Sequence, residues 1–382
     1  MRYKLLGRSG LRVSELCLGC GTFGVNWGSL GSDEQESRRI LDSFLEAGGN
    51  YLDTSNRYQE GQSEQWLGGF LEGRRQDVVI GTKYSLFDQM TNGRDPNAGG
   101  NHRKNLLRSI EGSLRRLRTD YIDLLWIHIA DLTTPVDEIL RMLDALVRSG
   151  KVLYIGASNF PAWWMARANT LADAYGWTPF IATQAEYSIV ERSLEPEFLP
   201  MCAELDIAIV CWSALGGGMV TGKYNRPPLD ASVPNRLMPH VDPQGHAFWT
   251  EATKRNLAIM DEVVAFADGI GRRPVEIALR FLMQQQVPTI PIFSARTVAQ
   301  CREALGAVEF ALSPEEIAEL DRITLPAISS VMPEAGPYPY PMLEYGSPAL
   351  PNFYSRVMVF GDNEAKIDNH RRKFPYRHQG GA

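Results

Sequence analysis

The stretch YIDLLWIHIADLTTPVDEILRMLDALVRSGKVLYIGAS, residues 121–158, contains the unit from which the fold of the whole chain can be inferred. An apolar run at 122–128 is followed by a helical pattern at 135–149 and then by a second apolar run at 154–158. Apolar runs that alternate with amphipathic helices are typical of parallel strands covered by helices. The stretch therefore predicts a strand, a crossover helix and a second, parallel strand.

The same alternation continues in both directions along the chain. The predicted strands are Glu15–Leu18, Tyr51–Asp53, Val78–Thr82, Ile122–His128, Tyr154–Ser158, Ile181–Ala185, Ala208–Trp212 and Thr289–Ile292. Helical patterns lie near 33–47, 63–71, 102–118, 135–149, 161–175, 196–205, 251–285 (with a break around 269–274) and 297–305. Eight alternations favour an α/β fold closed into a (β/α)8 TIM barrel over an open sheet. A hairpin between Tyr3 and Val13 is expected to plug the bottom of this barrel.

Three segments exceed a plain barrel. Residues 83–101 and 216–248 are predicted to be long loops that follow strands. Residues 331–382 contain 8 aromatic residues and 7 prolines, and disordered segments usually contain few aromatic residues. We therefore expect a barrel over residues 1–330 and a C-terminal extension, 331–382, that packs on it, either over the mouth of the active site or around the outside.

Composition and charge argue against several classes of partner. The net charge is −6, from 39 basic and 45 acidic residues, so no global cationic field would attract nucleic acid. The arginine-rich stretch 103–118 carries leucines at helical spacing and is interpreted as a solvated helix face. No apolar run approaches the roughly 18 residues of a membrane helix, and the N-terminus does not resemble a secretory signal. The charge, hydropathy and size do not indicate an oligomeric state.

The five cysteines are an odd, scattered set, which predicts reduced thiols and a cytoplasmic protein. Cys17 and Cys20 form one CxxC pair without a second, so we interpret them as structural thiols and expect no metal site.

Residues 19–24, Gly-Cys-Gly-Thr-Phe-Gly, match the GxGxxG pattern of dinucleotide-binding Rossmann domains. In that motif a helix opens immediately after the glycines. Here the chain continues through a loop, and helix signals begin only at Ser32 and Asp33. We interpret the glycines as a tight loop that lets the backbone around Gly21, Thr22 and Phe23 approach a ligand.

Four polar residues stand at or just beyond the ends of successive predicted strands: Asp53, Tyr58, Lys83 and His128. A parallel barrel brings the C-terminal ends of its strands to one rim, where the active sites of such barrels lie. Each residue alone has an ordinary structural explanation, such as a helix cap or a core histidine. Four titratable groups at unrelated strand ends indicate a catalytic cluster.

The segments around these residues resemble the aldo-keto reductase family. Residues 50–64, NYLDTSNRYQEGQSE, and 150–160, GKVLYIGASNF, are similar to two signatures of that family, and the resemblance extends from about Arg2 to Thr324. It implies that Asp53, Tyr58, Lys83 and His128 form a catalytic tetrad. Tyr58 would be the general acid or base, with a pKa lowered by Lys83. Asp53 would hold Lys83, and His128 would orient and polarise the carbonyl oxygen.

The resemblance also implies a nicotinamide cofactor. Ser158, Asn159 and Gln184 would bind the carboxamide, and Trp212 would stack on the ring. The residues implied for the phosphates and the remaining cofactor contacts are Ser213, Leu215, Gly217, Lys223, Ser294, Arg296, Gln300, Glu303, Gly21, Thr22, Phe23 and Asp53. Lys223 could equally be a solvated loop residue. Arg296 as a partner for a 2′-phosphate favours NADP(H), with NAD(H) as the alternative. The pair Phe293-Ser294 and Ala304 depart from the family pattern.

The long loops are most similar to the aryl-alcohol-dehydrogenase-like and channel-β-like branches. Trp27, Tyr84, Phe87 and Ile129 are expected to line an apolar pocket for aromatic or polycyclic aldehydes, ketones or alcohols. Two alternatives are a cofactor-binding redox sensor of the same fold with negligible turnover, and a Rossmann dehydrogenase. The complete tetrad favours the enzyme.

Overall fold

A computed structural model describes residues 1–86, 95–225, 247–324, 346–347 and 350–351 of the chain, with only the backbone described at 247–254, 346–347 and 350–351.

Eight parallel strands close into a barrel in the order β10-β3-β4-β5-β6-β7-β8-β9. They are β3 (Cys17–Gly19), β4 (Tyr51–Asp53), β5 (Val79–Tyr84), β6 (Ile122–Ile127), β7 (Val152–Ser158), β8 (Ala182–Glu186), β9 (Ala208–Trp212) and β10 (Thr289–Phe293). β10 pairs in parallel with both β3 and β9, which closes the ring. The predicted α/β barrel and its eight strands are confirmed.

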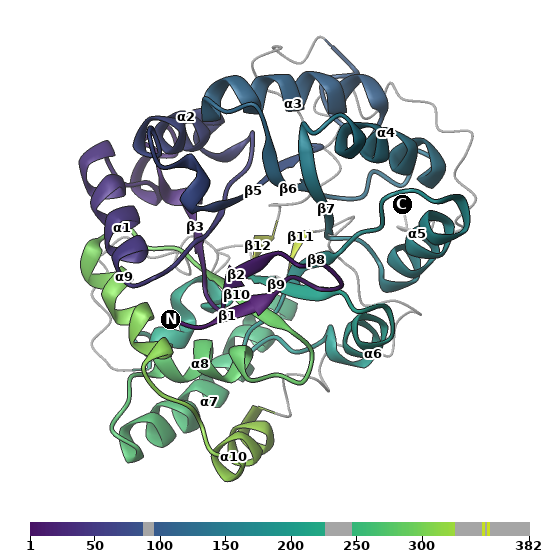
Figure 1. The fold of residues 1–382 in the computed structure, drawn as a ribbon. Coiled ribbons are helices and arrows are strands. Elements are labelled where there is room, and N and C mark those ends of the chain that lie inside the picture. Colours follow the sequence, from purple (N-terminus) through teal and green to yellow (C-terminus); the bar gives the residue numbers. More distant parts are fainter. Residues whose placement is uncertain (87–94, 226–246, 325–345, 348–349, 352–382) are drawn as a thin grey trace.

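Helices surround the strands (Figure 1). They are α1 (Glu34–Glu46), α2 (Gln62–Phe70), α3 (Arg103–Leu117), α4 (Val136–Arg148), α5 (Ala162–Tyr175), α6 (Glu195–Leu205), α7 (Ala247–Gly269), α8 (Pro274–Met283), α9 (Val298–Leu305) and α10 (Pro314–Thr324). The expected break around 269–274 separates α7 from α8. α10 was not predicted from the sequence, although Ser313 caps it by accepting a hydrogen bond from the Glu316 amide.

The arginine-rich stretch forms α3, whose buried face includes Leu106, Ile110 and Leu114, while its arginines remain on the solvent side. Leu107 was expected on the apolar face but is 42% exposed. The helix ends at Arg118, which has a left-handed φ of 53°. The stretch is therefore an amphipathic covering helix, as its spacing predicted.

The strands alternate between two apolar layers. In β9, Ala208, Val210 and Trp212 belong to the cluster inside the barrel, whereas Ile209 and Cys211 pack outward under the helices. Successive strand residues point to opposite faces of a sheet. This alternation decides which residues at the C-terminal rim can face a common site.

The N-terminal end of the barrel is closed by the hairpin of β1 (Tyr3–Leu5) and β2 (Arg12–Ser14). Lys4 Nζ donates hydrogen bonds to the carbonyl oxygens of Met283 (2.6 Å) and Thr289 (2.9 Å). The hairpin thus lies at the bottom, as predicted, and leaves the opposite rim for a site.

All five cysteines are buried free thiols. In the C-terminal extension the structure describes a short pairing of β11 (Gly346–Ser347) with β12 (Leu350–Pro351). The rest of residues 331–382 lies outside the described residues, so its packing on the barrel stays a prediction.

Candidate active site

Five of the predicted site residues occupy the inward register of their strands. Asp53, Lys83, Ser158, Gln184 and Trp212 lie at or near the C-terminal ends of β4, β5, β7, β8 and β9. In each strand the residue two positions earlier also faces inward, as Tyr51, Ala182 and Val210 do. The period of two along each strand therefore brings these side chains to one rim of the barrel.

The four residues of the expected tetrad lie together at this rim. Lys83 Nζ bonds the Asp53 carboxylate, donates to the Thr54 carbonyl (2.8 Å), and lies 4.7 Å from the centroid of the Tyr58 ring. The Tyr58 and His128 rings meet edge to face, with centroids 5.8 Å apart and an interplanar angle of 83°. Lys83 is thus a buried cation that contacts both the carboxylate and the phenol ring.

The Asp53 carboxylate is shared between two donors. Its second oxygen accepts a hydrogen bond from the Gln184 side-chain nitrogen (2.9 Å). Burial raises the pKa of Asp53 above its usual value, even though Lys83 and Gln184 act to lower it. One N–H of the Gln184 amide therefore bonds Asp53, which leaves its second N–H and its amide oxygen for a bound carboxamide.

The phenol of Tyr58 does not have the lowered pKa that the sequence analysis expected. Burial raises the pKa of Tyr58 well above its usual value, and the charge of Asp53 adds to this. Lys83 directs its N–H groups to Asp53 and Thr54 and approaches the Tyr58 ring over its face. Tyr58 is therefore a neutral phenol at neutral pH, which suits a proton donor.

His128 directly follows β6 and is also held neutral. Burial, together with the nearby Lys83 ammonium, places the pKa of His128 well below its usual value. Its Nδ1 lies 3.3 Å from Ser55 Oγ, and its amide donates to the Tyr84 carbonyl (2.8 Å) and to Ser85 Oγ (3.2 Å). A neutral imidazole can donate a hydrogen bond to a carbonyl oxygen without adding charge.

A buried polar cluster behind His128 was missed in the sequence. The Asn101 side-chain nitrogen donates to Ser85 Oγ and to the Ile129 carbonyl (both 2.9 Å). Its oxygen accepts from the Asp131 amide (2.8 Å), and Asp131 in turn accepts from the Asn101 amide (2.7 Å). Asn101 thus joins the loop after β5 to the loop that carries His128. An asparagine in a long polar loop gives no sequence signal for this role.

Asn159 organises the wall formed by β7 to β9. Its amide nitrogen donates to the His128 carbonyl (2.9 Å) and to Ser158 Oγ (3.0 Å), and its oxygen accepts from Trp212 Nε1 (2.9 Å). Asn159 has a left-handed φ of 57°, a conformation that asparagine tolerates better than most residues. The polar side chains and the indole expected to hold a nicotinamide ring are therefore adjacent.

The turn after β9 has the form of a phosphate cradle. Ser213 and Gly217 have positive φ values of 57° and 64°, and a Cβ on Gly217 would meet no atom within 4 Å. Successive backbone N–H groups in such turns can bind anions. Leu215 is the N-cap of the 3-10 turn η6 (Gly216–Thr221). Close to this turn, Lys223 Nζ lies over the Tyr224 ring, 4.8 Å from its centroid. The Gly216 and Gly218 amides already donate to the Ser213 and Leu215 carbonyls (2.7 and 2.8 Å). A pyrophosphate would therefore depend on the other amides of this turn and on the neighbouring cation.

The adenosine end of the expected site lies between β10 and α9. The Arg296 guanidinium donates to the Ser29 carbonyl (2.9 Å), and the Arg296 amide donates to Gln300 Oε1 (2.8 Å). Ser294 is exposed at the end of β10, and Glu303 pairs with Arg273 at 3.6 Å. The Val298 amide at the helix N-terminus is already bonded to the Glu36 carboxylate (2.7 Å). A phosphate would therefore depend on Arg296 more than on the N-terminus of α9.

Three of the expected cofactor residues follow the end of β3. Gly21 lies under the Tyr58 ring, and Thr22 Oγ1 donates to the Ala295 carbonyl (2.8 Å). Phe23 is fully buried. Thr22 thus ties the first loop to the β10 end of the site. Phe23 packs against Phe70 at 6.4 Å and contributes no exposed surface for a ligand.

The expected substrate residues divide into different environments. Trp27 lies edge to face with Tyr58, with centroids 6.0 Å apart, and Ile129 belongs to the inner apolar cluster. Tyr84 directly follows Lys83, which points into the barrel, so the Tyr84 side chain points outward and is buried under the helices. Its hydroxyl donates a hydrogen bond to the Asn101 carbonyl (3.3 Å). The expectation that Tyr84 lines the pocket is not met. Phe87 lies outside the described residues.

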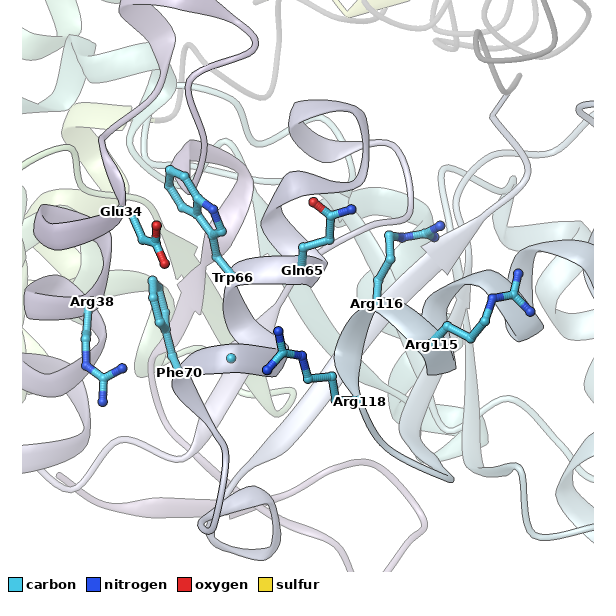
Figure 2. Close-up of a pocket in the computed structure, with 9 residues that line it drawn as sticks. Glu34, Arg38, Gln65, Trp66, Phe70, Arg115, Arg116 and Arg118 are labelled. Atoms are coloured by element: carbon cyan, nitrogen blue, oxygen red, sulfur yellow. The ribbon is translucent and has the colours of Figure 1, made fainter.

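A separate cavity of about 590 Å³ lies on the outer surface over α2, between α1 and α3. Figure 2 shows Trp66, Phe70, Glu34 and Arg38 on one side of it and Arg115, Arg116 and Arg118 on the other. Arg116 bonds Glu64 (2.7 Å), Arg118 approaches Glu72 (3.8 Å), and Arg38 approaches Asp42 (3.9 Å). Three of these arginines thus lie near carboxylates, and none of the predicted site residues lines this cavity.

Across the described ranges, no group of three or more histidine, cysteine or acidic side chains could hold a metal ion. Within the same part of the chain, no helix is long and apolar enough to cross a membrane.

The family match, together with the closed parallel barrel, shows that this chain is an NAD(P)-dependent oxidoreductase. More specifically, the chain belongs to the aldo/keto reductase family, whose model matches residues 15–324. A norsolorinic acid reductase of Aspergillus flavus is 36% identical over 323 residues, which are 83% of this chain and 79% of that protein. An aryl-alcohol dehydrogenase [NADP(+)] of Phanerodontia chrysosporium is 34% identical over 81% of this chain and 82% of its own. An uncharacterized oxidoreductase of Bacillus subtilis is 35% identical over 88% of this chain and 99% of its own.

Proposed function

We propose that this protein is an NADP(H)-dependent oxidoreductase that interconverts aromatic aldehydes or ketones with their alcohols, with Tyr58 as the general acid and base. The observation that carries the proposal is the buried cluster of Asp53, Lys83, Tyr58 and His128 at the strand ends. Trp27 beside Tyr58 supports an aromatic substrate. So do the names of relatives that act on aryl alcohols and norsolorinic acid.

The reduced nicotinamide, when bound, would supply a hydride to the carbonyl carbon, while the π electron pair of the C=O bond moves to oxygen. That oxygen takes the proton of the Tyr58 hydroxyl, so the products are an alcohol and a phenolate. The Lys83 ammonium stabilises the phenolate, and Asp53 holds Lys83 in place. The neutral imidazole of His128 orients the carbonyl oxygen by donating a hydrogen bond. Alcohol oxidation uses the same groups in reverse, with the phenolate as base.

The cofactor would be held by the Asn159, Ser158 and Trp212 cluster at its nicotinamide end, by the backbone near Gly217 at its pyrophosphate, and by Arg296 at its adenosine end. The exposed polar position of Ser294 and the cationic Arg296 favour a 2′-phosphate and hence NADP(H). The measurement is the ratio of kcat/KM for NADPH to that for NADH. A preference for NADH would contradict this part of the proposal.

The central test is the turnover of substituted benzaldehydes by the wild type and by Tyr58→Phe. General acid catalysis typically contributes about 10²–10⁴-fold, so we expect kcat to fall by that factor in Tyr58→Phe. Cofactor affinity should be retained, because the phenol ring remains. Tyr3→Phe is a matched control, since its hydroxyl bonds the Gly48 carbonyl at the opposite end of the barrel. Cofactor binding with negligible turnover by the wild type in both directions would contradict the proposal and favour a redox sensor.

A further inference from the structure

The chain after Tyr58 takes an unusual backbone path. Gln59, Glu60 and Gly61 have φ values of 51°, 58° and 89°, so three successive residues are left-handed. This conformation costs a residue with a side chain roughly 1–2 kcal/mol. Such strain persists only where the surrounding structure holds it, and it often marks functional sites.

The side chain of Gln59 shows what holds this turn. It is fully buried; its Oε1 accepts a hydrogen bond from the Trp27 amide (2.8 Å), and its Nε2 donates to the Gly21 carbonyl (3.2 Å). The Gln59 carbonyl accepts a further bond from the Asn26 side chain (2.8 Å). One residue therefore holds both the beginning and the end of the loop 21–27.

The glycine-rich loop is shaped around this glutamine. A Cβ on Gly24 would lie 2.5 Å from Gln59 Cβ, and one on Gly31 would lie 3.3 Å from Gln59 Nε2. Gln62 adds a bond from the Val25 amide to its Oε1 (2.7 Å). The glycines that imitate a dinucleotide motif thus allow the loop to close over a buried side chain.

The loop carries Trp27, whose ring lies against Tyr58. Gln59 is covalently next to Tyr58 and hydrogen-bonded to the main chain of Trp27, so it fixes the position of one ring relative to the other. We propose that Gln59 is a positioning residue that determines substrate specificity. By holding Trp27 beside the proton-donating tyrosine, it sets the preference for carbonyl compounds that carry an aromatic ring. This inference rests on the proposed function.

The test replaces Gln59 by asparagine. Asparagine enters the left-handed region more readily than most residues, but it is one methylene shorter and cannot reach both Trp27 and Gly21. We expect kcat/KM for benzaldehyde to fall at least about tenfold, mainly through KM, whereas that for butanal changes less than about threefold. Val25→Ala is the matched loop control, because that side chain is 53% exposed. It should leave both substrates unaffected.

A double-mutant cycle tests whether Gln59 acts through Trp27. Trp27→Ala should reduce the aromatic preference to the same extent as Gln59→Asn, and the double variant should lose little more, because both changes remove one interaction. Additive losses would overturn the proposal. Equal losses for benzaldehyde and butanal would also overturn it, since they would show a general structural role.

A spectroscopic readout separates this inference from the proposed function. The difference in near-ultraviolet circular dichroism between the wild type and Trp27→Phe reports the ordered environment of Trp27. This difference should be lost on the Gln59→Asn background, and its survival would overturn the positioning role. If the wild type turned over no carbonyl substrate, the proposed function would fail, and the spectral difference would decide the positioning role by itself.

Discussion

Each end of the barrel contains a buried carboxylate bonded to a buried cation. At the bottom, Glu15 bonds Arg280 (3.2 Å) and Arg2 (3.2 Å), and Arg280 also donates to the Ala307 carbonyl (2.7 Å). At the C-terminal rim, Asp53 bonds one cation within the part of the chain that the structure describes, Lys83, and it accepts a further hydrogen bond from Gln184. The two sites share burial and charge but differ in how completely the negative charge is balanced.

The pKa values follow this difference. Burial by itself would raise the pKa of Glu15, but Arg280 and Arg2 outweigh it and leave the pKa below its usual value. At Asp53 burial prevails, and the pKa is raised despite Lys83. The bottom pair is therefore arranged as a structural link between the first strand region and α8. The rim pair is less completely balanced, and its cation also faces the Tyr58 ring. Substitutions in the two ion pairs are therefore expected to affect activity and stability differently.

The largest effect is expected for Lys83→Met at the rim. Turnover should fall by about 10²–10⁴-fold, because the Tyr58 phenolate loses its stabilising charge. Stability should fall by about 3–5 kcal/mol, because Asp53 becomes an uncompensated buried charge. Urea unfolding and steady-state kinetics measure the two quantities. The double variant Asp53→Asn/Lys83→Met should regain stability but not turnover, and recovery of both would contradict a catalytic role for Lys83.

At the bottom, Arg280→Met should lower stability by about 3 kcal/mol, the lower end of the range for a broken buried pair, since Arg2 still contacts Glu15. The kcat per folded molecule should be unchanged, because Arg280 is at the opposite end of the barrel from Tyr58. The measurement pairs urea unfolding with kinetics at a temperature where the variant remains folded. A kcat that falls together with stability would remove the distinction between the two ends.

The sequence predicted the residues at the strand ends far better than the loop residues that hold them in position. Asp53, Lys83 and His128 follow from strand ends, because the register of parallel strands in a barrel dictates where these residues meet. The outward direction of Tyr84 could have been predicted from the same period of two, since it follows the inward Lys83. Asn101 and Gln59 could not, because their contacts depend on loop conformations such as the left-handed φ of Gln59. The pKa of Tyr58 depends on desolvation, which only the packed structure shows.

A smaller effect concerns His128 and acid stability. The unfolded chain binds a proton at this residue below about pH 6.5, whereas the folded chain does not until a much lower pH. The unfolded state therefore holds more protons, and stability falls as the pH is lowered from 6.5. Relative to His128→Gln, the wild type should lose about 2 kcal/mol between pH 6.5 and 5, at about 1.4 kcal/mol per pH unit. Parallel unfolding free energies for both proteins over this interval would contradict a neutral, buried imidazole.

The smallest expected effect is a change of stability at alkaline pH that is caused by Lys4, at the bottom of the barrel. Burial lowers the pKa of Lys4 to about 8, with opposing contributions from Glu15 and Cys211, which raise it, and from Arg280 and Arg2, which lower it. The unfolded chain keeps the proton up to a pKa of about 10.5, so between pH 8 and 10.5 it holds more protons than the folded chain. Stability contributed by Lys4 should therefore rise with pH over this window. Because Lys4 is partly exposed, we expect the wild type to gain only about 1 kcal/mol relative to Lys4→Met. A constant difference between the two unfolding curves would contradict a lowered pKa for Lys4 in the folded protein.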